Sequence, residues 1–229
     1  MRGAPRALPP GGEPRYPAAM DPTFRVPRHA LLRAKLTLIR RRETPSATFR
    51  RVLAEIGAIL TAESLRDLPE ATARIETPLG PMEAPILHDP EPCLVAVLRA
   101  GLGLLEGARV VLPDAPVGHL GLVRDEATLK ASEYVVRLPK DLARRGALVL
   151  DPMLATGGSA IQAVSRVKEA GATRVRFACV VAAPEGVQAL RAAHPDVPIL
   201  SAALDERLNA QGYIVPGLGD AGDRCFGTD

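Results

Sequence analysis

The chain has 229 residues, of which 47% are hydrophobic, so it can fill the core of one domain, or of one domain with an appendage. Its apolar runs are shorter than the roughly 18 residues of a membrane span, no apolar secretory leader opens it, and its three cysteines are too far apart for a disulfide framework, which together favour a cytoplasmic protein. The net charge of +3 combines a basic stretch, with 12 Lys and Arg against 3 Asp and Glu in residues 1–51, and an acidic remainder.

The basic N-terminal stretch has two interpretations. It could bind nucleic acid through its positive charge. However, aromatic residues make up only 3% of the chain and no RNA-stacking motif is present. The favoured interpretation is a face of arginines that is solvated or contacts a second subunit.

Residues 1–22 contain six prolines and three glycines, which predicts a disordered tail before a single domain over residues 23–229. Two amphipathic helices come next, one beginning near residue 28 and one over about residues 47–63. The apolar face of the first consists of Leu31, Leu32, Leu36 and Ile39. We expect these helices to cover a face of the core or to make a subunit contact.

An alternation of apolar runs and helical patterns then predicts a doubly wound, mostly parallel α/β sheet. The expected strands are 93–98, 117–123, 134–138, 147–150, 175–182 and 197–203, with helices from about residue 101, over 159–170 and over 184–193. The Pro-rich stretch 71–92 is expected to form a short β segment over the core, and the polar stretch 124–133 a mobile arm. Residues 209–229 are rich in glycine without a helical period, and such long irregular segments are usually functional.

A strand, an acid, a Gly-rich turn and a helix follow one another in Ala147-Leu-Val-Leu-Asp-Pro-Met-Leu-Ala-Thr-Gly-Gly-Ser-Ala160. The paired glycines let backbone N–H groups converge on one point, and the helix N-terminus adds unpaired donors and a positive dipole end. Thr156 and Ser159 add hydroxyl donors. Asp151 repels a phosphate but can accept hydrogen bonds from sugar hydroxyls, directly or through a metal. The segment therefore predicts a sugar-phosphate site, with an ordinary turn and a capping serine as the alternative.

Two nucleotide-binding motifs are excluded. The P-loop needs a lysine after its glycines, and none follows here. The pattern Gly-x-Gly-x-x-Gly occurs in Gly217-Leu-Gly-Asp-Ala-Gly222, but Pro216 precedes it and only residues 223–229 follow. That remainder is too short for the helix and second strand of a dinucleotide-binding unit.

Charged residues end three of the expected strands. Arg99, Arg124 and Asp151 each come directly after an apolar run. Ligands bind at the carboxyl ends of the strands in open parallel sheets, so these three side chains are expected to converge there. For Arg99 an anion contact is favoured over a surface salt bridge, and for Arg124 the two interpretations are equally supported.

These residues resemble the phosphoribosyl-pyrophosphate (PRPP) motif of the type I phosphoribosyltransferases, and more closely the uracil phosphoribosyltransferases. The type I motif usually has two adjacent acids, whereas Pro152 takes the second position here, as it does in the uracil branch. The resemblance extends from about residue 28 to the end of the chain. It is carried by Val149–Ser159, Leu98-Arg-Ala-Gly-Leu-Gly103, Ala182-Ala-Pro-Glu-Gly186, Ala193-His-Pro-Asp-Val197 and, most specifically, Gly212-Tyr-Ile-Val-Pro-Gly-Leu-Gly-Asp-Ala-Gly-Asp-Arg-Cys-Phe-Gly-Thr228.

The resemblance implies a type I fold with N-terminal helices and a small C-terminal hood, and the pyrimidine-salvage reaction in which uracil and PRPP give UMP and pyrophosphate. It implies Mg²⁺, carried by the pyrophosphate of PRPP and not by direct protein ligands, a homodimer or higher homo-oligomer, and GTP as a candidate effector. The implied catalytic residues are Arg99, Asp151 and Asp220. The implied PRPP-binding residues are Arg99, Arg124, Asp151, Pro152, Met153, Leu154, Ala155, Thr156, Gly157, Gly158, Ser159 and Asp220. The implied uracil-binding residues are Ile214, Gly219, Asp220 and Ala221.

Two other functions stay open on the sequence. One is an RNA-binding pyrimidine regulator on the same fold, which the basic N-terminus favours and the uracil signature of residues 212–228 disfavours. The other is a transferase for a different nucleobase. Backbone groups of the glycine-rich C-terminal segment suit uracil, because its edge alternates acceptor, donor and acceptor.

Overall fold

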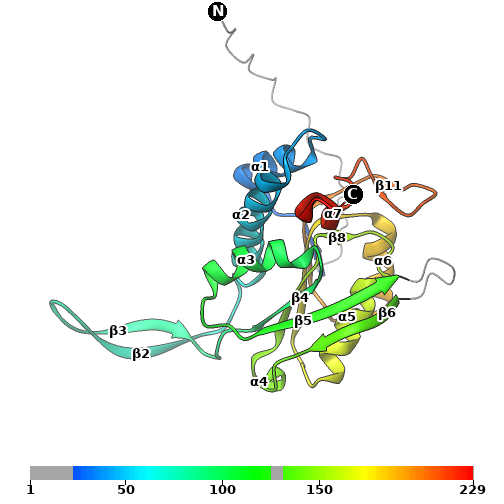
Figure 1. Cartoon of the computed structure of the whole chain (residues 1–229). Helices are drawn as coiled ribbons and strands as arrows, with labels where there is room; N and C mark the ends of the chain where they lie inside the picture. Colours follow the sequence, from blue (N-terminus) through cyan, green and yellow to red (C-terminus); the bar gives the residue numbers. More distant parts are fainter. Residues whose placement is uncertain (1–22, 125–130, 229) are drawn as a thin grey trace, which may run out of the picture.

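A mostly parallel β-sheet forms the centre of the structure, a computed structural model that describes residues 23–124 and 131–228 (Figure 1). The order of its strands is β1-β10-β9-β7-β4-β5-β6, with β8 paired to β9, and β5 pairs with β6 antiparallel. The predicted α/β class and doubly wound sheet are confirmed. The strands are β1 (Phe24–Arg25), β4 (Cys93–Leu98), β5 (Val117–Arg124), β6 (Ala131–Arg137), β7 (Ala147–Leu150), β8 (Met153–Leu154), β9 (Val175–Ala182) and β10 (Ile199–Leu204). The predicted tail and most of the predicted arm lie outside the described residues.

Helices cover both faces of the sheet because successive side chains of a strand point to opposite faces. In β4, Leu94 and Ala96 belong to one buried cluster, and Val95 and Val97 to the other. The first cluster is closed by α1 (Ala30–Arg40), α2 (Ser46–Ser64) and α3 (Gly101–Val111), and the second by α4 (Leu142–Arg145), α5 (Gly158–Glu169) and α6 (Pro184–Ala193). Both predicted N-terminal helices therefore pack on the core.

The first helix confirms the predicted apolar face with one exception. Leu32, Leu36 and Ile39 are buried, whereas Leu31 is 64% exposed, because it lies on the opposite side of α1. The side chain of His29 accepts a hydrogen bond from the N–H of Leu32 and caps the helix. This cap fixes the residue at which α1 begins.

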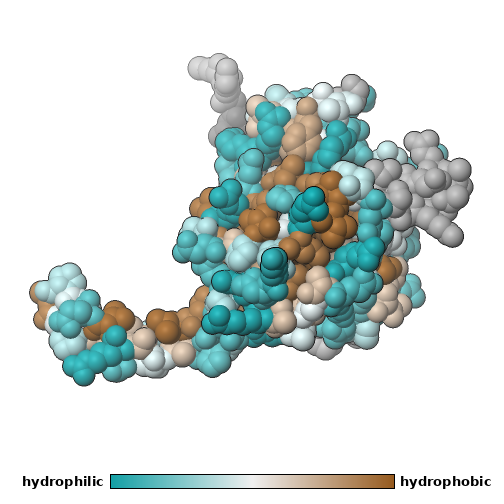
Figure 2. Space-filling view, turned by 60° about the horizontal axis from the view of Figure 1, so that its bottom comes forward, coloured by the Kyte–Doolittle hydropathy of each residue, from teal (hydrophilic) through white to brown (hydrophobic). Residues whose placement is uncertain are grey.

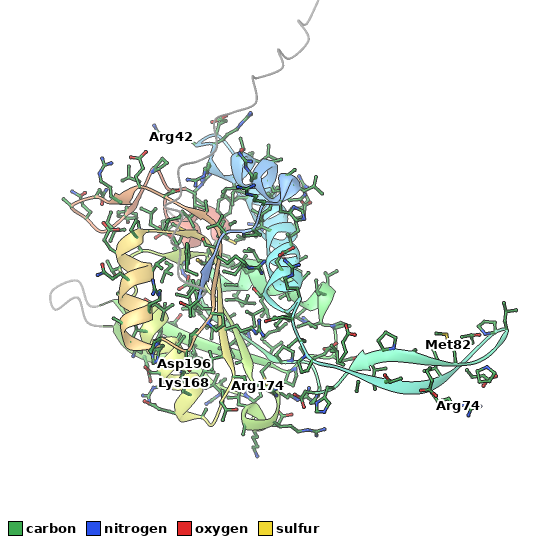
Figure 3. The ribbon with its side chains drawn as sticks, turned by 180° about the vertical axis from the view of Figure 1, so that it is seen from behind. Arg42, Arg74, Met82, Lys168, Arg174 and Asp196 are labelled. Atoms are coloured by element: carbon green, nitrogen blue, oxygen red, sulfur yellow. The ribbon has the colours of Figure 1, made fainter. Side chains whose placement is uncertain are left out.

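The structure confirms β structure in residues 71–92, but the predicted short length and the predicted place over the core were wrong. These residues contain β2 (Glu70–Thr77) and β3 (Gly80–Leu87), which pair with each other as an antiparallel hairpin. The hairpin projects from the body of the molecule instead of covering it (Figures 1 and 3). Its two strands have eight residues each, as many as the longest central strands, although Pro81 and Pro85 lie in β3.

The C-terminal segment also differs from its prediction, which had no helix there. It forms a small antiparallel pair, β11 (Arg207–Leu208) with β12 (Ile214–Val215), and then α7 (Ala221–Phe226). The side chain of Asp220 accepts a hydrogen bond from the N–H of Asp223 at 2.9 Å and caps α7. This segment packs over the cluster closed by α1, α2 and α3 and forms the predicted hood.

The direction of winding reverses between β4 and β7. The chain passes from β4 through α3 to β5 on one side, and from β7 through α5 to β9 on the other side. Because α3 and α5 cover opposite faces, the loops after β4 and β7 diverge and leave a crevice at the carboxyl edge of the sheet.

Candidate functional site

A cavity of about 680 Å³ lies at this reversal point and receives residues from three parts of the chain. The end of β4 contributes Arg99, the β7–α5 connection contributes Asp151 and Ser159, and the C-terminal segment contributes Ile214 and Asp220. The full lining consists of Val97, Leu98, Arg99, Ala100, Leu122, Asp151, Met153, Ala155, Ser159, Gln211, Gly212, Tyr213, Ile214, Gly219, Asp220, Ala221 and Gly222. The sheet thus brings together residues that are more than 100 positions apart in the sequence.

The β7–α5 connection has the geometry of an anion cradle. Gly157 precedes α5 with φ of +87°, and a Cβ there would lie 3.0 Å from that of Ala189 and 3.1 Å from the carbonyl oxygen of Gly186. Only glycine suits this position. The N-cap residue of α5 is Gly157, which brings no side chain to the end of the helix, so the positive end of the helix dipole is open to an anion in the turn.

The structure places the other predicted residues of this connection in two ways. Met153 and Ala155 line the cavity, whereas Pro152 and Leu154 are buried away from it. The carbonyl oxygen of Pro152 accepts from the N–H groups of β9, at 2.9 and 3.1 Å, which ties the turn to the sheet. Thr156, Gly157 and Gly158 form the turn itself and are not part of the cavity wall.

Asp151 ends β7 and is the acid of the cavity floor. Its side chain is partly accessible from the cavity, but the surrounding protein raises the pKa of the carboxyl from an ordinary 3.8 to about 7, because burial disfavours the charged form. A hydrogen bond from the N–H of Met153, 3.3 Å long, acts in the opposite direction and is the smaller effect. The carboxyl can therefore gain or lose its proton near neutral pH.

Arg99 connects the cavity to the C-terminal helix. Its guanidinium donates to a carboxylate oxygen of Asp223 at 3.1 Å and to the hydroxyl of Thr228 at 3.3 Å, and about half of the side chain is exposed. Asp223 also accepts from Thr228 at 2.7 Å. Arg99 therefore does form the salt bridge that was the alternative to an anion contact, and its partner, Asp223, lies in α7 beside the cavity. Arg124 ends β5, next to β4, and its side chain lies outside the described part.

The C-terminal segment forms the opposite wall. Ile214 and Ala221 are buried with exposures of 5% and 2%, and both line the cavity together with Gly219 and Asp220. Each of the four predicted uracil-binding residues is therefore on this wall. Gln211 and Tyr213 also line this wall, and the sequence analysis gave neither of them a role.

Most basic residues described near the N-terminus are engaged within the chain. Arg25 pairs with Glu63, Lys35 pairs with Glu55, and Arg50 donates to the carbonyl oxygen of Cys225. Arg40 donates to the nearly buried carboxylate of Asp205, and the sequence analysis did not predict this pair. Among the described residues, the basic stretch thus takes part in ion pairs and hydrogen bonds within the chain.

A second cavity, of about 290 Å³, lies at the opposite edge of the sheet beneath the hairpin. Its basic residues, Arg174 and Arg176 among them, each pair with an aspartate, and the amino ends of β7 and β9 form its floor. Ligand sites of doubly wound sheets lie at the carboxyl edge, so we assign the candidate site to the larger cavity.

Comparison with known proteins agrees with this site. A family model described as uracil phosphoribosyltransferase matches residues 26–228. The uracil phosphoribosyltransferase of Enterococcus faecalis is 52% identical over 205 residues, which cover 90% of this chain and 98% of that protein. The uracil phosphoribosyltransferase of Rhizobium leguminosarum is 52% identical over 200 residues, covering 87% and 96%.

Solved structures extend the comparison to the fold. The AQ2163 protein of Aquifex aeolicus superposes with a TM-score of 0.86 at 37% identity, covering 90% of this chain and 99% of that chain. An adenine phosphoribosyltransferase of Trypanosoma brucei superposes with a TM-score of 0.54 at 15% identity, covering 80% and 84%, which shows a shared fold. Within residues 23–124 and 131–228, no helix is long and apolar enough to cross a membrane.

The raised pKa of Asp151 predicts a stability cost that depends on pH. The folded chain retains a proton that the unfolded chain releases above about pH 4, so stability falls as pH rises from about 4 to 7. Asp151→Asn removes this cost and should raise the free energy of unfolding at pH 8 by about 1 to 4 kcal/mol, with little change at pH 4. Urea unfolding at both pH values measures the difference.

Asp196→Asn provides the matched control. The pKa of Asp196 is lowered, chiefly by its hydrogen bond from Lys168, so this substitution should lower stability slightly at pH 8 (Figure 3). An equal effect of Asp151→Asn at both pH values would contradict the burial effect assigned to Asp151.

Proposed function

The chain belongs to the uracil phosphoribosyltransferase family, and we propose that it joins uracil to the ribose of PRPP in the cavity between β4, β7 and the C-terminal segment. The observation that carries this proposal is that Asp151 and Ser159, on either side of the anion cradle, line one cavity together with an arginine and a wall of backbone groups. Its volume of about 680 Å³ is within the range usual for small-molecule sites.

The β7–α5 connection would bind the ribose 5-phosphate. The N–H groups at the start of α5 and the hydroxyl of Ser159 donate to phosphate oxygens. Asp151, on the cavity floor, accepts hydrogen bonds from the ribose hydroxyls. This role requires the carboxylate form, which hydroxyl donors favour because they stabilise the negative charge.

The pyrophosphate would lie on the side of Arg99, with Arg124 at the end of the adjacent strand. Pyrophosphate is more highly charged than Asp223 and would replace it as the partner of Arg99. As pyrophosphate leaves C1, negative charge develops on it and the arginines stabilise this charge. Positive charge develops on the ribose, toward which Asp151 and Asp220 present carboxylates.

The residues present fit the use of Mg²⁺ brought by PRPP. Asp151 and Asp220 line the cavity, and carboxylate oxygens are the hard atoms that suit Mg²⁺ and its water shell. When bound, Mg²⁺ would neutralise negative charge on the pyrophosphate. Asp151 and Asp220 are the acids of the cavity that would help to retain it there.

Uracil would bind against Ile214 and the backbone of residues 219–221. Ile214 supplies an apolar surface for the ring, and the glycine-rich backbone supplies N–H and C=O groups for its edge. An exocyclic amine, as in cytosine, would meet a backbone donor and be disfavoured. No nucleophilic side chain is required, and burial raises the pKa values of Cys93 and Cys179 to about 11 and 12.

We also propose that the chain forms a homodimer through the β2–β3 hairpin. One face of the hairpin is apolar over three successive pairs, since the register pairs Ala71 with Ile86, Ala73 with Ala84 and Ile75 with Met82. Ile75, Met82 and Ile86 are each at least 40% exposed, and apolar atoms run along the hairpin in Figure 2. An isolated two-stranded hairpin is marginal in water, so a second copy of the chain would stabilise it. A GTP effector and a cytoplasmic location belong to the proposal on the family resemblance alone.

The first test of the proposal separates the two substrate subsites. The protein with Mg²⁺ and PRPP should form UMP from uracil but not products from cytosine, hypoxanthine or orotate.

Asp151→Ala should raise the KM for PRPP at least tenfold, because it removes the acceptor for the ribose hydroxyls. Gly219→Val should raise the KM for uracil more than that for PRPP, because φ of +79° at residue 219 strains a β-branched side chain. An unchanged KM for PRPP in Asp151→Ala, or equal losses in Gly219→Val, would count against these roles.

The second test concerns the hairpin. Ile75→Arg places a charge on the apolar face, and Glu76→Arg places the same charge on the opposite face one residue later. The wild type and Glu76→Arg should sediment with twice the 24.2 kDa mass of the chain, and Ile75→Arg as a monomer. Identical sedimentation of the two variants would show that the apolar face of the hairpin does not hold the dimer.

A further inference from the structure

A nearly buried ion pair lies behind the wall that faces the base. Asp205 follows β10, and its side chain is 5% exposed. Arg40, the last residue of α1, donates to both of its carboxylate oxygens, at 2.7 and 2.5 Å. Such bidentate pairs fix the orientation of both side chains, while burial of the two charges has a desolvation cost.

Arg40 and Asp205 also hydrogen-bond to both backbone polar groups of Gly217, in the C-terminal segment. The N–H of Gly217 donates to Asp205 at 2.7 Å, and its carbonyl oxygen accepts from Arg40 at 2.7 Å. Gly217 has φ of +61°, and a Cβ would lie 2.1 Å from the carbonyl oxygen of Ile214. The ion pair therefore fixes a tight turn between Ile214 and Gly219, two residues of the cavity wall.

A second arginine holds the next residue from the same side. Arg224 donates to the carbonyl oxygen of Leu218 at 2.7 Å, and to those of Ile39 and Arg41 at the end of α1, at 2.5 and 2.6 Å. Its guanidinium lies 4.6 Å from the centre of the Phe49 ring, on α2. Arg224 thereby provides a donor for the carbonyl oxygen of Ile39 in the last turn of α1.

We propose that Arg40 and Asp205 are positioning residues for base recognition, an inference that rests on the proposed function. Backbone groups can discriminate uracil only if the backbone is fixed, and a glycine-rich segment is not rigid by itself. The ion pair binds the outward-facing groups of the turn and so sets the direction of the inward-facing groups at residues 219–221. The two residues touch no substrate and act through Gly217.

The test measures the binding of two ligands to folded variants by titration calorimetry. UMP occupies both the cradle and the base wall, whereas Mg²⁺–PRPP carries no base and would reach this wall only through the side chain of Asp220. Asp205→Asn should weaken UMP binding at least tenfold and change PRPP binding by less than twofold. Arg40→Lys keeps the charge but loses the paired donors, and should give a smaller loss for UMP alone.

Two further variants separate positioning from folding. The double variant Arg40→Met/Asp205→Leu replaces the ion pair with apolar side chains, which often preserves stability, and it should bind PRPP normally but UMP at least tenfold more weakly. Arg42→Met is the matched control, because Arg42 is exposed two residues beyond Arg40 and should leave both affinities unchanged (Figure 3).

The inference is overturned if the variants of Arg40 and Asp205 bind UMP as the wild type does, or if they lose PRPP and UMP equally. A wild-type protein that binds PRPP but not UMP would contradict the proposed function instead.

Discussion

The parallel pairing of β4 with β7 is the interaction on which the site depends. Leu94, Val95 and Ala96 pair with Leu148, Val149 and Leu150, and both strands are buried on both faces. The register places the ends of the two strands side by side, so the residues that follow, Arg99 and Asp151, face one cavity. Because the chain leaves these strands toward opposite faces, the crevice stays open for a ligand instead of being filled by a connection.

The acid at this crevice shows a conflict between stability and ligand binding. Burial raises the pKa of Asp151 to about 7, so the carboxylate that would accept ribose hydroxyls is the less stable form of the folded protein without a ligand. Hydroxyl donors from a bound sugar would remove this penalty. An acid whose charged form is disfavoured by the surrounding protein is typical of a binding site and unusual in a purely structural position.

Much of this site could be predicted from the sequence because its residues end apolar strands. Asp151 and Arg99 each follow a run of buried side chains, and that local pattern indicates both the sheet and its carboxyl edge. The six-residue helix α7 is too short to show a helical period, and the prolines of β3 disfavour a strand although a two-stranded hairpin tolerates them at its edge. The contact of Arg40 with Asp205 joins positions 165 residues apart, and no local pattern indicates a partner at that distance.

The hood thus depends on the N-terminal helices as well as on its own sequence. Arg40 and Arg224 join α1 to the turn at Gly217, so the base wall and the sugar-phosphate cradle are held by different parts of the molecule. A crystal structure of the complex with UMP tests this arrangement most directly. The account predicts the phosphate at the start of α5 near Gly157 and the base against residues 219–221. A UMP molecule bound at the opposite edge of the sheet, or with its phosphate away from α5, would contradict it.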